Sequence, residues 1–122
     1  MRKLFPAVAG LLLLAACGDP TKKHDYGCTA TTYGGVTGAC VQFHVTEVEG
    51  NAAEVACHNK GGTWAYHACD AASQVPGYCQ VDSASDYSLS GTPAEVFFYE
   101  PQTPTTASAA CTTGGGTWVP GT

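Results

Sequence analysis

Residues 57–64 read CHNKGGTW, and residues 111–118 read CTTGGGTW. Each stretch places a cysteine, three further residues and then Gly-Gly-Thr-Trp, and the two stretches lie 54 residues apart. At this offset residues 41–64 align with residues 95–118 without a gap, with eight identities in 24 positions. Repetition at constant spacing indicates an internal duplication, so two copies of one small unit are predicted.

Each copy is predicted to contain two strands, a helix and the Gly-Gly-Thr-Trp closure. Residues 41–45 alternate apolar and polar side chains, which is typical of a half-buried strand, and residues 96–99 are their counterpart. Residues 27–33 and 77–81 come before these strands and can pair with them. The sequence therefore predicts an α+β domain, small and disulfide-rich, at residues 27–122. Its duplicated strand-strand-helix units, residues 27–69 and 77–118, share one antiparallel sheet.

Capping residues predict where the helices begin and end. Asn51, with Glu54 three residues later, resembles a capping box, so the first helix is predicted to begin there. In the second copy Thr103 can cap the helix and Pro104 suits its first position. Each helix is predicted to end at a glycine pair, because glycine adopts the left-handed conformation that ends a helix at no steric cost. The following Thr-Trp would return over the core.

The N-terminus has the pattern of an export signal. A positively charged start is followed by an apolar run to residue 14, which is too short to span roughly 30 Å of hydrocarbon. The run ends in LAAC, residues 14–17, which resembles the lipobox of bacterial lipoproteins. That resemblance implies a signal peptide at residues 1–16, acyl chains such as palmitate on Cys17, and a polar tether at residues 17–26. The alternative is an ordinary secretory signal cleaved near Ala16, with Cys17 unmodified.

Six further cysteines remain after this processing, and an even number in a small exported domain predicts disulfides. They are Cys28, Cys40, Cys57, Cys69, Cys79 and Cys111. The repeat leaves two symmetric maps: Cys28–Cys57 with Cys79–Cys111, or Cys28–Cys111 with Cys57–Cys79. Cys40 pairs with Cys69 in both. The first map is preferred, because each disulfide closes a loop of about 30 residues inside one unit. Closing a loop of that length lowers the entropy of the unfolded chain and stabilises the fold by roughly 3.5 kcal/mol.

The stapled strands and the repeated C-x₃-G-G-T-W box together resemble uncharacterised cysteine-rich lipoproteins of bacterial envelopes. The resemblance covers most of residues 27–118 and implies an envelope location and an oxidised fold. It implies no catalytic residue. Gly18 follows Cys17 where the enteric sorting scheme has an aspartate in inner-membrane lipoproteins. The outer membrane or the cell surface is therefore implied.

The charge of the processed chain excludes one class of function. Three lysines oppose ten acidic residues, a formal net charge of −7, and no arginine remains. Nucleic-acid binding normally needs a basic surface, so no nucleic-acid partner is predicted. Adjacent Cys57 and His58 cannot easily bind one ion, and no C-x₂-C spacing exists, so no metal site is predicted. The sequence has no P-loop or dinucleotide motif, so no cofactor is predicted.

No catalytic site is predicted either. The chain has four histidines, at positions 24, 44, 58 and 67, but no nucleophile motif accompanies them. Carboxylate pairs at residues 47 and 49, and at 82 and 86, read as solvated acids. The chain is therefore predicted not to be an enzyme.

Val96 and Phe98 form a candidate partner surface. If the helices cover the Phe97 side of the strand, these two side chains are exposed unless the loop at residues 82–93 folds over them. An exposed apolar patch often marks a contact site. We therefore expect a structural or interaction module, held to the membrane by its lipid, whose partner is an envelope protein or a glycan. The alternative is an exported ligand-binding or inhibitor-like module that uses the 82–93 loop and this surface.

Overall fold

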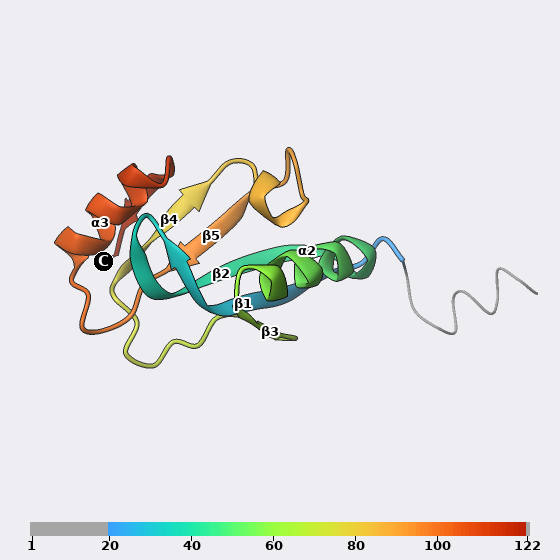
Figure 1. Cartoon of the computed structure of the whole chain (residues 1–122), viewed down its shortest axis with the longest axis horizontal. Helices are drawn as coiled ribbons and strands as arrows, with labels where there is room; N and C mark the ends of the chain where they lie inside the picture. Colours follow the sequence, from blue (N-terminus) through green and yellow to red (C-terminus); the bar gives the residue numbers. More distant parts are fainter. Residues whose placement is uncertain (1–19, 122) are drawn as a thin grey trace, which may run out of the picture.

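The computed structural model describes residues 20–121, so the predicted signal peptide, Cys17 and residue 122 lie outside the described residues. The described chain is an α+β domain with a six-stranded antiparallel sheet, two α-helices and three disulfides (Figure 1). The elements are β1 (Lys23–Tyr33), β2 (Val36–Thr46), α2 (Glu47–Asn59), β3 (Thr63–Ala65), β4 (Gly77–Val81), a 3₁₀ turn η1 (Ser85–Tyr87), β5 (Ala94–Phe97), α3 (Pro104–Thr113) and β6 (Thr117–Pro120).

The strand order is β3-β1-β2-β5-β4-β6, so the sheet is built from two halves that meet at β2 and β5. Each half consists of a hairpin and one outer strand that follows the helix. Within the sheet, the halves join through three pairs of residues on β2 and β5: Cys40 with Phe97, Val41 with Val96 and Gln42 with Glu95. The β1–β2 hairpin turns through Gly34 and Gly35, whose φ angles of 58° and 86° suit a tight hairpin turn.

Both helices pack on one face of the sheet and enclose the core. Helix α2 packs on β1, β2, β3 and η1, and α3 packs on β4 and β6. Each helix presents small residues to the sheet at helical spacing, Ala53 and Cys57 in α2 and Ala107 and Cys111 in α3, all 0% exposed. The two largest fully buried side chains, Phe43 of β2 and Phe98 directly after β5, also lie on this face.

Each half also covers part of the other. The tip of the β1–β2 hairpin lies against α3, where the Tyr33 hydroxyl donates a 3.0 Å hydrogen bond to the Gly114 carbonyl. In return, the 82–93 loop lies against α2, with the Lys60 ammonium 5.3 Å from the Tyr87 ring centroid. The Tyr87 ring also packs edge-on against Phe43, at 5.2 Å between centroids. These crossed contacts make one core out of the two halves.

The repeated box folds in the same way at both sites, as a helix end followed by an outer strand. In the first box the amides of Gly61 and Gly62 donate to the carbonyls of His58 and Cys57, at 3.0 and 2.9 Å. This is the Schellman arrangement, in which a left-handed residue, here Gly61 with φ 82°, ends the helix. In the second box Gly115 and Gly116 donate to Thr112 and Cys111 in the same pattern. The predicted helix stops are confirmed.

The second glycine of each box cannot be replaced by a larger residue without a steric collision. A Cβ on Gly62 would lie 2.6 Å from Cys28 Sγ and 2.9 Å from Cys57 Sγ. A Cβ on Gly116 would contact Cys79 Sγ even more closely. The tryptophan that follows then enters the outer strand, where Trp64 pairs with Cys28 and Trp118 with Cys79. The box therefore packs a helix end, a disulfide and an outer strand together.

Two predicted boundaries were wrong. Helix α2 begins at Glu47, because the Thr46 side chain accepts from the Glu49 amide and the Glu49 carboxylate accepts from the Thr46 amide, a capping box. The cap predicted at Asn51 therefore lies inside the helix. Strand β1 begins at Lys23, so residues 23–26, which were predicted to belong to a tether, are part of the sheet. Residues 23–26 pair with β2, and Tyr26 is buried against Trp64, at 5.3 Å between ring centroids.

Candidate functional site

Val96 and Phe98 do not form an exposed surface, so this prediction was wrong. Both side chains are 0% exposed. Val96 lines a small internal cavity with Ala84 and Tyr87 of the 82–93 loop, and Phe98 packs against the rings of Tyr33 and Trp118. The loop that was considered as a binding element therefore contributes three buried side chains, Ala84, Tyr87 and Leu89, to the core.

The error came from the constant offset between the two copies. The residue opposite Cys28 is Val41, and the residue opposite Cys79 is Val96, so corresponding strand positions differ by 55 residues. The offset of 54 between Cys57 and Cys111 holds for the helices, as between Ala53 and Ala107, and for the boxes, but not for these strands. A slip of one residue moves every side chain of a strand to the other face. Phe43 therefore corresponds to Phe98, and Phe97 faces away from the helices.

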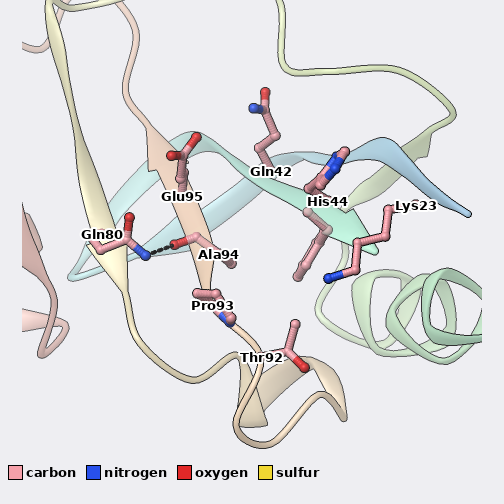
Figure 2. A pocket seen from close by; sticks show the side chains of 9 residues that line it. Lys23, Gln42, His44, Gln80, Thr92, Pro93, Ala94 and Glu95 are labelled. Atoms are coloured by element: carbon pink, nitrogen blue, oxygen red, sulfur yellow. Dashed lines mark hydrogen bonds between the residues drawn. The ribbon is translucent and has the colours of Figure 1, made fainter. Parts of the chain in front are cut away.

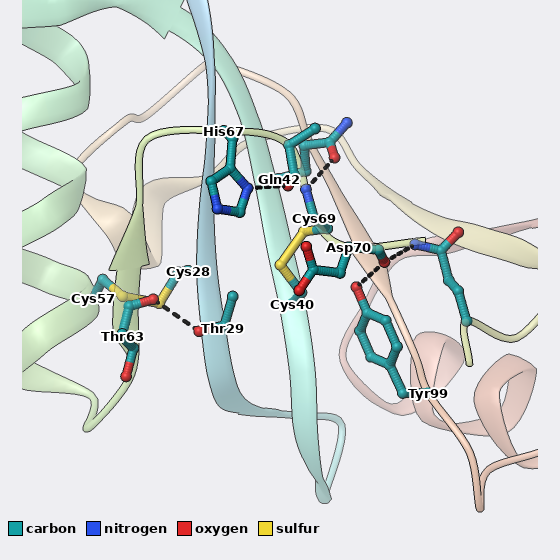
Figure 3. The surroundings of a disulfide bond; sticks show 12 residues. Cys28, Thr29, Cys40, Gln42, Cys57, Thr63, His67, Cys69, Asp70 and Tyr99 are labelled. Atoms are coloured by element: carbon teal, nitrogen blue, oxygen red, sulfur yellow. Dashed lines mark hydrogen bonds between the residues drawn. A yellow bond between two sulfur atoms is a disulfide. The ribbon is translucent and has the colours of Figure 1, made fainter. Parts of the chain in front are cut away.

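The disulfides join Cys28 to Cys57, Cys40 to Cys69 and Cys79 to Cys111. This is the map that keeps each link inside one half. The Cys40–Cys69 bond lies on the face opposite the helices and holds residues 66–76 across the sheet (Figure 3). The Cys69 amide also donates to the Gln42 side chain at 2.8 Å, and the Tyr99 hydroxyl donates to the Asp70 carbonyl at 2.8 Å. We call residues 66–76 the strap.

Chemical access to the three disulfides differs. The four cysteines of the Cys28–Cys57 and Cys79–Cys111 bonds are 0% exposed, whereas Cys69 is half-buried. Because all six cysteines among residues 20–121 are in disulfides, none of them supplies a thiol nucleophile or a thiolate metal ligand. Within the same range no three histidine, cysteine or acidic side chains gather as a metal site would require.

A cleft of about 300 Å³ lies where β2 and β5 diverge (Figure 2). The pairing of these strands stops at Gln42 and Glu95, and beyond that point β5 gives way to the end of the 82–93 loop. The cleft is lined by Lys23, Gln42, Phe43, His44, Gln80, Thr92, Pro93, Ala94 and Glu95. Six of these nine side chains can form hydrogen bonds and the other three are apolar, so the cleft suits a ligand with both polar groups and apolar surface.

A row of polar side chains from three strands forms the centre of the cleft. Glu95 of β5 lies opposite Gln42 of β2 on one side and Gln80 of β4 on the other. The Gln80 amide nitrogen donates to the Ala94 and Val81 carbonyls, at 3.4 and 3.3 Å. The glutamine amides are thus held in place on either side of a half-buried carboxylate. This row was not predicted from the sequence, because it depends on the pairing of three strands.

At the rim of the cleft, the His44 ring nitrogen Nδ1 donates to the Asp25 carboxylate at 2.8 Å. Both side chains are more than half exposed, at 67% and 51%. The other histidines lie apart from this pair: His24 at the start of β1, His58 near the end of α2, and His67 on the strap. An exposed pair of this kind contributes little to stability, so its place beside the cleft is its notable property.

The carboxylate pairs singled out in the sequence lie elsewhere. Glu47 and Glu49 belong to the first turn of α2, where acidic side chains stabilise the helix end. Hydrogen bonding from the Thr46 backbone lowers the pKa of Glu49. Asp86 lies in η1 beside Tyr87, and burial, with Asp86 as a further cause, raises the pKa of that phenol. The structure brings neither pair into the cleft.

No helix within residues 20–121 combines the length and the apolar character needed to cross a bilayer. Comparisons with protein-family models, curated proteins and solved structures found no match for this chain.

Proposed function

We propose that the chain is a lipid-anchored bacterial envelope lipoprotein, in which a disulfide-stabilised domain has a structural or interaction role. The observation that carries the proposal is the combination of the export pattern ending in Cys17 with three disulfides. Disulfides form and persist outside the cytoplasm, so an exported location accounts for both features. The resemblance of LAAC to a lipobox supplies the anchor.

The start of β1 adds to this proposal. Strand β1 begins at Lys23, which leaves five residues, 18–22, between the lipidated cysteine and the sheet. Five extended residues reach roughly 17 Å, so the domain would stay close to the lipid headgroups. Lys23 also lines the cleft, which would place the cleft at the end of the domain nearest the bilayer.

We also propose that the two halves arose by duplication of a strand-strand-helix unit. In support, the order of elements is the same in both, and the sheet order places each strand at the mirrored position of its counterpart. Cys28–Cys57 and Cys79–Cys111 each join a first strand to a helix end. A single-residue insertion between strand and helix would account for the offsets of 55 and 54. The Cys40–Cys69 link has no counterpart.

Mass spectrometry of the protein isolated from its host tests the anchor. The expected mature mass begins at Cys17 and exceeds the polypeptide mass by two or three acyl chains. A Cys17→Ser variant is expected to keep its signal peptide and to lose the acyl mass. A mass for the natural protein that corresponds to unmodified Cys17 would refute the lipid anchor and leave an ordinary secreted domain.

The interaction role is tested by capture from envelope extract, with Gln80→Ala as a cleft variant and Ser108→Ala on α3 as a matched surface control. Capture of the same envelope protein or glycan by the natural chain and the control, but not by the cleft variant, is the expected result.

The second candidate function is a binding module for a small ligand. It is favoured by Thr92 and Pro93, through which the 82–93 loop lines the cleft. Capture that the cleft variant leaves unchanged would count against both.

A further inference from the structure

The polar row in the cleft contains hydrogen-bonding atoms that the protein does not use. Gln42 accepts one hydrogen bond through its amide oxygen, which leaves its amide nitrogen as a donor. Gln80 donates through its nitrogen, which leaves its amide oxygen as an acceptor. Among residues 20–121, no side chain or backbone group donates to the Glu95 carboxylate. One free donor, the Gln42 amide nitrogen, and two kinds of free acceptor, the Glu95 carboxylate and the Gln80 amide oxygen, therefore lie side by side across about two strand spacings, each about 4.8 Å.

Two aromatic rings extend this row along the strands. Tyr78 lies two residues before Gln80, and Phe97 lies two residues after Glu95, so both rings are on the face that carries the cleft. The centroids of the two rings are 5.8 Å apart, and both side chains are half-buried. Two residues along a strand correspond to about 7 Å. Two half-buried aromatic rings, tilted by 39° to each other, therefore lie about 7 Å along the strands from the polar row.

We propose that the cleft binds a neutral glycan, with one sugar ring at the polar row and the next against Tyr78 and Phe97. Sugar hydroxyls both donate and accept hydrogen bonds, so adjacent hydroxyls match a carboxylate flanked by two amides. The C–H faces of sugar rings are apolar and pack on aromatic side chains. The single lysine and single glutamate of the cleft offset each other in charge, which favours a neutral ligand.

The size of the cleft agrees with a short segment of glycan. About 300 Å³ is at the lower end of the range for ligand pockets, and suits one or two sugar rings. An extended peptide is the main alternative ligand, because beyond Gln42 the side of β2 that faces away from β1 pairs with no strand. A peptide would use the backbone of β2 and would have no need of the glutamate and the two amides. The inference rests on the proposed interaction role and names its partner class, but it is independent of the lipid.

The experiment uses the protein as isolated, in a detergent without a sugar headgroup, and follows amide NMR signals during titration. The probes are cellobiose and N,N′-diacetylchitobiose, with trialanine as the peptide probe. The expected result is that at least one disaccharide, at millimolar concentration, shifts the side-chain amide signals of Gln42 and Gln80. Glu95→Gln is expected to weaken that binding about tenfold or more, since a hydrogen bond to a charged group is lost. Glu54→Gln is the matched control and is expected to bind as the natural protein does, because Glu54 lies on α2 outside the cleft lining, where it accepts from the Tyr66 hydroxyl.

Three results would overturn the assignment: no shift with either disaccharide, shifts that Glu95→Gln leaves at natural affinity, or shifts of the cleft signals by trialanine alone. Unchanged backbone spectra of the Glu95→Gln variant establish that it is folded. The acyl mass of the same sample is measured separately. Sugar binding by a chain without acyl groups would refute the anchor and keep the cleft assignment, and an acylated chain without sugar binding would do the reverse.

Discussion

Replacing the two adjacent glycines of one box by alanine, one at a time, distinguishes the cost of a left-handed backbone conformation from the cost of a steric collision. Gly61 has φ 82°, but a Cβ there would have no atom within 4 Å. Gly62 has a Cβ position crowded by both sulfurs of the Cys28–Cys57 disulfide and by the Thr29 carbonyl oxygen at 3.1 Å. Gly61→Ala therefore introduces only left-handed strain, whereas Gly62→Ala introduces a collision with atoms that belong to a cross-link and a strand.

The two costs can be estimated. A left-handed alanine costs roughly 1–2 kcal/mol, partly offset by about 0.4–1 kcal/mol from the stiffer unfolded chain. Gly61→Ala is therefore expected to lower the free energy of unfolding by about 1 kcal/mol. Overpacking of a filled site costs about 1–3 kcal/mol, and more where the neighbours cannot move. Gly62→Ala is expected to lower the free energy of unfolding by about 3 kcal/mol, since a disulfide between a strand and a helix has little freedom to shift.

The assay is denaturant unfolding of the oxidised protein, followed by far-ultraviolet circular dichroism. Gly115 and Gly116 give an internal replicate, because Gly115 is also left-handed with open space and Gly116 also lies against a disulfide. Equal losses for the two substitutions within each box would refute the role assigned to the second glycine. A Gly62→Ala variant with natural stability would refute it as well.

Three further predictions concern the strap, the helix cap and the orientation of β5. Under mild reductant Cys40–Cys69 is expected to open first, because Cys69 is the only half-buried residue among the six cysteines, and its loss is expected to cost about 3.5 kcal/mol; alkylation followed by mass spectrometry detects the order. Thr46→Ala is expected to cost about 1 kcal/mol at neutral pH. The pKa of Glu49 is lower in the folded state than in the unfolded state. The capping box therefore contributes its full stability above the unfolded-state pKa of Glu49, and this contribution is lost as the pH falls through the folded-state pKa. The difference in stability between the Thr46→Ala variant and the natural protein should consequently shrink in acid. Phe98→Ala is expected to cost about 3–5 kcal/mol, and Phe97→Ala less than half of that, in the same unfolding assay.

Each of these predictions has its own contradicting result. Simultaneous opening of all three disulfides would mean that burial does not control their reduction. Asn51→Ala is the control for the cap, and a larger loss there than at Thr46 would contradict the observed start of α2. Equal losses at Phe97 and Phe98 would contradict the assignment of faces in β5.

The parts of the fold that depend on local chemistry could be predicted from the sequence. Each Gly-Gly pair requires a left-handed residue and a close approach, so the helix stops and the returning Thr-Trp were foreseen. Thr103 and Pro104 also mark the start of α3 as predicted. The start of α2 was missed because Thr46 and Glu49 lie in a polar stretch that resembles a loop. Lys23 and the residues after it were taken for a tether because one face of that strand is exposed.

The parts that depend on pairing between distant strands could not be predicted in the same way. Whether Val96 or Phe97 faces the core depends on one residue of register, which is set where β5 pairs with β2 and β4. The cleft likewise requires Gln42, Gln80 and Glu95 to be neighbours across three strands. No local signal in any one of these strands specifies that arrangement.

The lengths of the six strands bear on how copies of this chain behave when crowded. The two longest strands, β1 and β2, have 11 residues each and lie inside the sheet, whereas the outermost strands, β3 and β6, have three and four. Pro120, at the end of β6, also lacks an amide hydrogen. Short edge strands, and an edge strand that ends in proline, offer few backbone groups with which a strand of a neighbouring molecule could pair. Copies confined at high density to a two-dimensional layer would therefore resist joining edge to edge into fibrils.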